Sequence, residues 1–180
     1  MRLFIAFNFN NKVKNYLSEV QSIIKTCALK GNYTKYDNFH LTLRFLGEIP
    51  DYEVDNIIDI IDIVSNQVKP FSIKIGSINS FSRKNKHIVY VDVLKNKEGL
   101  YELAKLLNTL IDNKIRDAHV YNFKPHITIA REVIFNEVSS LINVNPFNEE
   151  IIVDNITLFR SSRDKYQGLI YTPIYTKLLS

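Results

Sequence analysis

Cysteine is almost missing from this chain of 180 residues, in which Cys27 is the only one. A single cysteine excludes an intramolecular disulfide and a cysteine-rich zinc site, and it suits a protein that works in a reducing compartment. We therefore expect the protein in the cytoplasm. Cys27 lies near the end of a predicted helix, where a packing role is more plausible than a nucleophilic one.

Long apolar runs are missing as well. No stretch approaches the roughly 20 apolar residues that cross a bilayer. The short apolar run after Arg2 also lacks the features of a secretory signal. These absences predict a protein without membrane attachment, and we expect it to be a monomer. The net charge of +4 favours anionic ligands only mildly.

Three common catalytic or nucleotide-binding loops are absent: the GxSxG elbow, the Walker-type phosphate loop and the GxGxxG turn. The chain also lacks a long linker and any low-complexity segment. With 46% hydrophobic residues, it can bury one sizeable core. We predict a single domain over residues 1–180, made of two closely packed lobes.

Apolar residues recur along the chain at helical and strand spacing in turn. Helices are predicted from Asn10 or Asn11 to about Leu29, over 51–66 and over 97–113, with a short helical segment at 135–142. Strands are predicted over 2–8, 39–50, 71–79, 87–94, 125–131, 150–159 and 168–178, with a loop around Gly31 and an edge or bulge at Pro173. The first helix is expected to bury Val13, Leu17, Val20, Ile23 and Ile24. Interleaved helices and mostly antiparallel strands predict an α+β fold.

The stretch FHLTLRFLGEIP, residues 39–50, has unusual polar residues for a strand. Side chains alternate between the two faces of a strand. One face therefore carries His40, Thr42 and Arg44, while the core face carries Leu41, Leu43 and Phe45. A histidine, a hydroxyl and a guanidinium on one face suggest more than contact with solvent.

A near copy of this motif occurs later in the chain. HLTL at 40–43 returns as HITI at 126–129, and each copy opens a predicted strand. The chain has only four histidines, so two HxT patterns by chance are improbable. The repeat predicts a pseudo-symmetric protein in which His40 and His126 face each other across a shared groove. His87 and His119 lack a following threonine and are expected to be structural or surface residues.

Two histidines and two threonines suit one kind of chemistry. Imidazole titrates near neutral pH, so one histidine can act as a base while the other acts as an acid. Threonine hydroxyls are donors for the non-bridging oxygens of a phosphate. The set predicts in-line displacement at phosphorus, without a cofactor. Neither motif brings a further histidine or carboxylate at ligand spacing, so no metal site is predicted.

The sequence resembles the two-histidine phosphoesterase superfamily, and within it the RNA 2',3'-cyclic phosphodiesterases, also called 2'-5' RNA ligases. The resemblance rests on RLFIA at 2–6, NFHLTLRFLGEI at 38–49, FKPHITIAR at 123–131, ITLFRSS at 156–162 and YTP at 171–173. These segments occur in the expected order and span nearly the whole chain. The segment before the first motif lacks the tryptophan and the proline-rich turn that are common in the family.

The resemblance implies a bilobal α+β fold with the two HxTx strands facing a central cleft. It implies metal-independent hydrolysis of 2',3'-cyclic phosphates, on RNA ends or nucleosides, to 2'-phosphates. By position, His40 and His126 match the family's acid–base pair, Thr42 and Thr128 its phosphate ligands, and Arg131 a phosphate-contacting arginine.

Several alternatives stay open at this point. Arg44 either approaches the phosphate or faces solvent, and Arg131 reaches the site only if its strand bends. Lys124, Arg160, Arg163 and Lys165 form either a rim that attracts RNA or ordinary solvated charges. Candidates for base stacking are Tyr33, Tyr36, Phe39, Phe81 and Tyr121. The same site could also join RNA ends by a 2'-5' bond, act on another phosphodiester, or bind RNA ends without catalysis.

Overall fold

The computed structural model describes residues 1–115, 122–136 and 144–180. The helices are α1 (Asn11–Cys27), α2 (Val54–Ser65) and α3 (Lys97–Lys114), with single 3₁₀ turns at Tyr36–Asn38 and Asp51–Glu53. The strands are β1 (Arg2–Asn8), β2 (Ala28–Tyr33), β3 (His40–Glu48), β4 (Phe71–Arg83), β5 (Lys86–Lys95), β6 (His126–Phe135), β7 (Ile151–Val153), β8 (Asn155–Asp164) and β9 (Gly168–Leu178). The predicted α+β class is confirmed.

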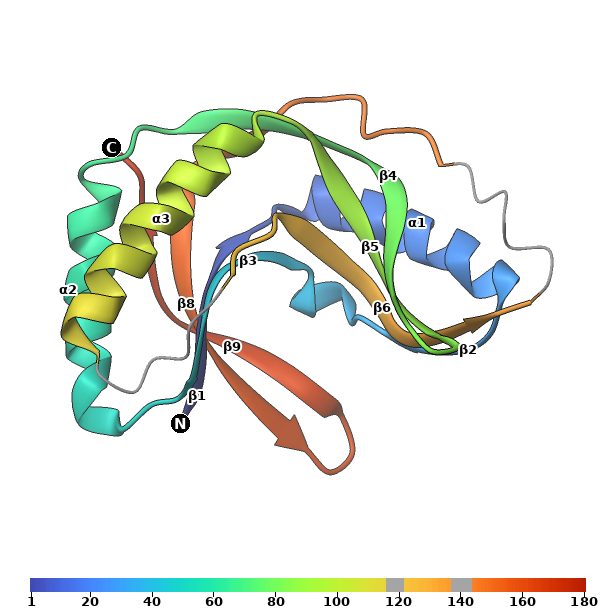
Figure 1. Ribbon diagram of the computed structural model, residues 1–180, viewed down its shortest axis with the longest axis horizontal. Coiled ribbons are helices and arrows are strands. Elements are labelled where there is room, and N and C mark those ends of the chain that lie inside the picture. The colour runs from blue at the N-terminus through green and yellow to red at the C-terminus, as the bar shows by residue number, and fades with distance from the viewer. Residues whose placement is uncertain (116–121, 137–143) are drawn as a thin grey trace.

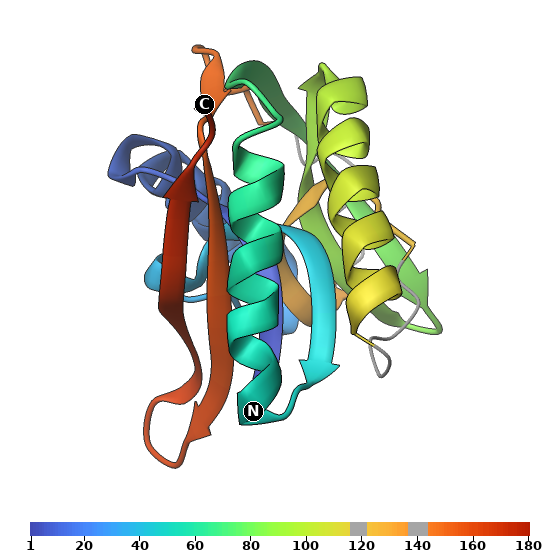
Figure 2. The same ribbon diagram turned by 90° about the vertical axis from the view of Figure 1, so that its left-hand side faces the viewer.

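The strands form two sheets. The four-stranded sheet has the order β3-β1-β8-β9, and the five-stranded sheet has the order β2-β6-β5-β4-β7. Neighbouring strands are antiparallel throughout both sheets. Helix α1 packs on β2 and β6 of the five-stranded sheet, while α2 and α3 pack on the four-stranded sheet. Figure 2 shows α2 and α3 side by side, with β3 between them in this view.

The predicted pseudo-symmetry is visible in the connections. Each HxTx strand follows a strand and a helix: β1–α1 precedes β3, and β5–α3 precedes β6, with β2 as an extra strand after α1. Each of these two helices packs on the sheet that contains the HxTx strand of the other half: α1 packs on the sheet with β6, and α3 contacts β3 (Figure 1). As a result, buried side chains from both sheets and all three helices belong to one hydrophobic cluster.

The start of α1 agrees with the sequence, but its end and its buried face differ in detail. The Asn10 Oδ1 accepts a hydrogen bond from the Val13 N–H at 3.0 Å, which caps the helix. The helix ends at Cys27 because the backbone of Ala28 is already extended and begins β2. The predicted loop around Gly31 is therefore wrong. Ile23, predicted to be buried, is 40% exposed.

The last predicted strands also need correction. The stretch 150–159 is two strands, because β7 pairs with β4 in one sheet and β8 pairs with β1 in the other. Pro173 lies on the edge strand β9, next to a register shift against β8, so the predicted edge and bulge are both confirmed. Of the predicted helical segment 135–142, Phe135 belongs to β6. Residues 137–143 lie outside the described residues, as does His119.

The helices of the described ranges are amphipathic and pack on the sheets. None of them is long and apolar enough to cross a bilayer.

Candidate active site

Each HxTx strand contains a β-bulge three residues after its histidine. In β3, Thr42 and Arg44 pair with successive residues of β1, which leaves Leu43 without a partner. In β6, the same kind of shift against β5 leaves Ile129 without a partner. One extra residue reverses the alternation of faces beyond that point. The internal repeat therefore extends from the motif itself to the backbone irregularity that follows it.

The first bulge changes the predicted positions of two side chains. Arg44 is 1% exposed and lies on the core side, where its guanidinium donates to Asn108 Oδ1 at 2.9 Å and Asp112 Oδ1 at 2.6 Å. The prediction that Arg44 shares the face of His40 is wrong, and it contacts neither the candidate site nor bulk solvent. Phe45, predicted for the core face, lines the site instead.

The second bulge brings Arg131 to the face of His126, which strict alternation did not allow. His40, Thr42, His126, Thr128 and Arg131 all line one pocket of about 370 Å³ between the two sheets. The structure thus brings together all five of the predicted site residues. The remaining lining residues are Arg2, Phe4, Phe45, Ser161, Ser162, Arg163, Leu169 and Tyr171.

The two histidines are held in the same way. The Nδ1 of His40 lies 2.7 Å from the carbonyl oxygen of Asn38, and the Nδ1 of His126 lies 2.7 Å from that of Lys124. A carbonyl only accepts, so each Nδ1 carries the hydrogen and each neutral ring keeps an unprotonated Nε2. In His40 this Nε2 is 2.9 Å from the Thr42 hydroxyl, which then acts as the donor.

Aromatic rings surround both imidazoles. The His40 ring lies 4.9 Å from Phe4 and 5.2 Å from Tyr171, measured between centroids. The His126 ring lies 5.6 Å from both Phe81 and Tyr90, which stack on each other. These apolar neighbours reduce the access of water to the imidazoles and disfavour their charged forms.

Of the aromatic candidates for base stacking, Phe81 lies beside a histidine and Tyr33 lines an adjoining hollow. Phe39 is buried in the core. The Tyr36 hydroxyl instead donates to Asn15 on α1 at 2.8 Å. Tyr121 lies outside the described residues.

Two aromatic neighbours of His40 were missed as site residues. Phe4 and Tyr171 belong to the quoted segments RLFIA and YTP, so their positions in the resemblance were the available signal.

The electrostatic environment lowers the pKa values of both histidines. Burial lowers the pKa of His40 from 6.5 to about 4, and the positive charge of Arg131 acts in the same direction. Burial also lowers the pKa of His126, with further lowering by Arg131 and Lys124. The hydrogen bonds to the two carbonyls oppose these shifts only in part. The neutral forms of both imidazoles are therefore favoured in the empty pocket, although arginines line it.

The pocket contains no arrangement typical of a metal site. Within residues 1–115, 122–136 and 144–180, no group of three or more His, Cys, Asp or Glu side chains could hold a metal ion. The charged residues that line the pocket are Arg2, Arg131 and Arg163. This donor set suits an anion, because guanidinium groups bind phosphate oxygens through paired hydrogen bonds.

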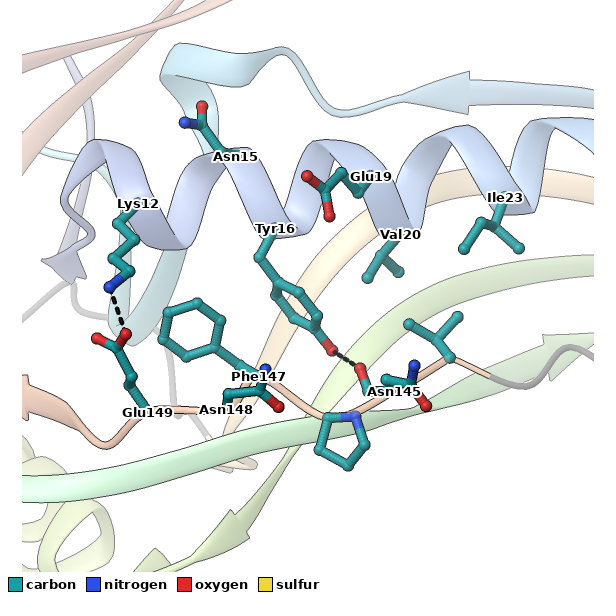
Figure 3. Close-up of a pocket in the computed structure, with 12 residues that line it drawn as sticks. Lys12, Asn15, Tyr16, Glu19, Val20, Ile23, Asn145, Phe147, Asn148 and Glu149 are labelled. Atoms are coloured by element: carbon teal, nitrogen blue, oxygen red, sulfur yellow. Dashed lines mark hydrogen bonds and ion pairs between the residues drawn. The ribbon is translucent and has the colours of Figure 1, made fainter.

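Another hollow lies between α1 and residues 144–149 (Figure 3). The Tyr16 hydroxyl donates to the Asn145 carbonyl at 3.0 Å across it, and Lys12 pairs with Glu149 at one end. This hollow shares no lining residue with the histidine pocket. None of its lining residues belongs to either motif.

The fold and the paired motifs define the class of this protein as a two-histidine phosphoesterase. More specifically, the chain belongs to the 2'-5' RNA ligase superfamily, whose family model matches residues 19–165.

Relatives and solved structures agree with this assignment. The chain is 30% identical to the RNA 2',3'-cyclic phosphodiesterase of Aquifex aeolicus and 27% identical to that of Thermotoga maritima. The first alignment covers 97% of this chain and 95% of the relative, and the second covers 97% and 94%. The crystal structure of TT0787 of Thermus thermophilus is 26% identical and superposes with a TM-score of 0.82, covering 99% of this chain and 98% of that one. E. coli LigT complexed with 3'-AMP has the same fold, with a TM-score of 0.76 at 22% identity and coverage of 99% and 98%.

Proposed function

We propose that this protein hydrolyses 2',3'-cyclic phosphates, at RNA ends or on nucleosides, to 2'-phosphates. One observation carries the proposal: two histidines from the two halves of a repeat, each with its Nδ1 held by a carbonyl, line a single pocket together with Thr42, Thr128 and Arg131. The names of the relatives in Aquifex and Thermotoga support the same reaction.

In the proposed mechanism, His40 is the general base and His126 is the general acid. The Nε2 of His40 takes a proton from water as the water oxygen bonds to phosphorus, and the Nε2–H of His126 protonates the departing 3'-oxygen as its bond to phosphorus breaks. His40 is assigned as the base because it is the more deeply buried of the two histidines and its pKa is lowered to about 4, which keeps its Nε2 unprotonated.

The remaining groups would stabilise charge on the phosphate. Thr42, Thr128 and Arg131 can donate hydrogen bonds to the non-bridging oxygens, where negative charge increases in the transition state. The Thr42 hydroxyl points at His40, so binding would require it to turn toward the phosphate. Because protein groups supply every proton transfer, we propose that the reaction needs no metal or cofactor. We also propose that the protein acts as a cytoplasmic monomer.

The test is hydrolysis of a nucleoside 2',3'-cyclic phosphate by purified wild-type protein and single variants. His40→Ala and His126→Ala should each reduce kcat/KM at least about 10²-fold, the usual effect of losing a general acid or base. Thr109→Ala, an exposed change on α3, serves as the control. Full activity in either histidine variant would refute the acid–base assignment.

A second substrate separates the two roles. When sulfur replaces the leaving 3'-oxygen, the thiolate departs without protonation, so the general acid is no longer needed. His126→Ala should then recover most of its lost activity, whereas His40→Ala should not. Recovery by the His40 variant alone would reverse the assignment.

The same groups could run the reaction backwards and join RNA ends through a 2'-5' bond. Incubation with a cyclic-phosphate end and a 5'-hydroxyl end tests this, and water at ~55 M should favour hydrolysis unless the second end is bound and oriented. Binding without any turnover would instead indicate an RNA-end binding module.

A further inference from the structure

A second hollow opens directly off the histidine pocket. It has a volume of about 650 Å³ and shares His40, Thr128, Arg131, Arg163, Leu169 and Tyr171 with that pocket. One wall consists of residues 31–35 and Asn38, from β2 and the segment that follows it, and the other consists of the β8–β9 hairpin. We call this hollow the side groove. A ligand that fills the histidine pocket could therefore continue into the side groove without leaving the protein.

The hairpin wall projects beyond the four-stranded sheet (Figure 1). Strand β1 pairs with β8 only as far as Arg160, whereas β8 and β9 continue to pair as far as Asp164 and Gly168. An isolated two-stranded ribbon is marginally stable in water, so the position of this ribbon depends on other contacts. Those contacts come from the opposite wall of the side groove.

Two side chains hold the ribbon in place. The Asn38 side chain forms two hydrogen bonds with the backbone of β9: its Nδ2 donates to the Leu169 carbonyl at 3.0 Å, and its Oδ1 accepts from the Tyr171 N–H at 3.2 Å. Near the turn, Lys35 Nζ donates to the Gln167 carbonyl. Asn38 and Lys35 therefore hold the β8–β9 ribbon, which forms one wall of the side groove, at two points.

Positive charge collects where the two hollows meet. Arg131 and Arg163 line both of them, and within the described part of the chain neither guanidinium makes an ion pair or hydrogen bond. The one carboxylate in the side groove, Glu132, is already paired with Lys86 at 2.8 Å and accepts from Asn32 at 2.9 Å. The junction therefore has two guanidinium groups that can bind anions. The proposed function supplies only one anion, the reacting phosphate, so one guanidinium has no assigned ligand.

We propose that the side groove binds the nucleotide that precedes the RNA end, with Arg163 holding the phosphodiester that joins it to the terminal ribose. Arg131 then binds the reacting phosphate. The preferred substrate is an oligonucleotide and not a free nucleoside cyclic phosphate. The inference rests on the proposed function, because that reaction sets the end of the RNA in the histidine pocket. A guanidinium suits this task, since its planar donors match two phosphate oxygens.

The test compares three substrates with terminal 2',3'-cyclic phosphates: a mononucleoside, a dinucleotide, and the same dinucleotide with a neutral methylphosphonate linkage. The wild type should have a kcat/KM about tenfold higher for the charged dinucleotide than for the other two, as expected for one charge-assisted hydrogen bond at an exposed site. In Arg163→Ala this preference should fall to about one, and in Arg163→Glu it should reverse. Equal losses on all three substrates, or an unchanged preference, would overturn the proposal.

Arg160→Ala is the matched control, because it removes the same charge from the same strand at an exposed position outside both hollows. It should retain both the preference and the turnover of the mononucleoside.

Binding of products separates this proposal from the proposed function. Affinities for the dinucleotide 2'-phosphate, with charged or neutral linkage, are measured by calorimetry and do not depend on turnover. The wild type could turn over none of the substrates and still bind the charged product about tenfold more tightly than the neutral one. That result would refute the proposed function and support nucleotide binding in the side groove. Equal affinities for the two products would refute the side groove whatever the turnover.

Discussion

The low pKa of His40 leads to a specific prediction about the pH dependence of catalysis. Burial among aromatic rings lowers this pKa from 6.5 to about 4, the charges of Arg131, His126 and Lys14 add to the shift, and the Asn38 carbonyl opposes it. A shift of this size favours the neutral imidazole by about 3 kcal/mol. The free enzyme should therefore keep an unprotonated His40 even in mildly acidic buffer.

The lowered pKa values of the two histidines determine how kcat/KM is expected to depend on pH. The acidic limb should fall near pH 4, where His40 gains its proton. The alkaline limb should fall below pH 6.5, because burial and two cations lower the pKa of His126 and its protonated form disappears as the pH rises. The charge of His126 is one of the causes that lower the pKa of His40, so the acidic limb reports His40 next to a protonated His126. Steady-state rates on a nucleoside 2',3'-cyclic phosphate, from about pH 4 to pH 9, measure both limbs.

One substitution should move only one limb. Lys124 lowers the pKa of His126 and is not among the charges that act on His40. Lys124→Ala should therefore shift the alkaline limb to higher pH and leave the acidic limb where it is. Lys165→Ala, which removes the same charge from the hairpin, should move neither limb.

Two results would refute this reasoning. One is an acidic limb close to pH 6.5 in the wild type, which would mean that His40 is not desolvated as the structure indicates. The other is a shift of the acidic limb in Lys124→Ala. In the substrate complex, by contrast, the negative phosphate favours protonated imidazoles, so the limbs of kcat should lie at higher pH than those of kcat/KM.

Three other predictions concern the buried arginine, the two lobes and metal ions. Asp112→Ala leaves the Arg44 guanidinium without its carboxylate partner and should lower the free energy of unfolding in urea by about 1–3 kcal/mol; wild-type stability would contradict this. The two lobes should unfold in one cooperative transition, because a helix from each half packs on the sheet of the other and both share a hydrophobic cluster. Two separate transitions by circular dichroism would show independent domains. EDTA should leave turnover unchanged, whereas a loss that added Zn²⁺ or Mg²⁺ reverses would indicate a metalloenzyme.

Most helices and strands could be predicted because local periodicity carries the information. The buried stripes of α2 and α3 follow helical spacing, and Asn10 provides the cap of α1. The exceptions have a common cause. The sequence ALKGNY of β2 has no apolar alternation and forms a strand because it pairs with β6. Likewise, the residues on either side of Asp154 have similar propensities, yet they pair with strands of different sheets.

The side groove could not have been predicted in the same way. Lys35 and Arg163 lie far apart in the chain, and no local pattern relates them. They line the same hollow only because Asn38 and Lys35 hold the projecting β8–β9 hairpin against the turn after β2. From the sequence, Arg163 could be part of an RNA-attracting rim or a solvated loop charge, and the second interpretation is slightly preferred.

The paired HxTx motifs are therefore the part of the site that the amino-acid order specifies. Two residues apart on a strand is a local relationship, so His40 with Thr42 and His126 with Thr128 had to share a face. The positions of Arg44, Phe45 and Arg131 depend instead on the bulges at Leu43 and Ile129. Those bulges arise from pairing with β1 and β5, and pairing between distant strands belongs to the tertiary structure.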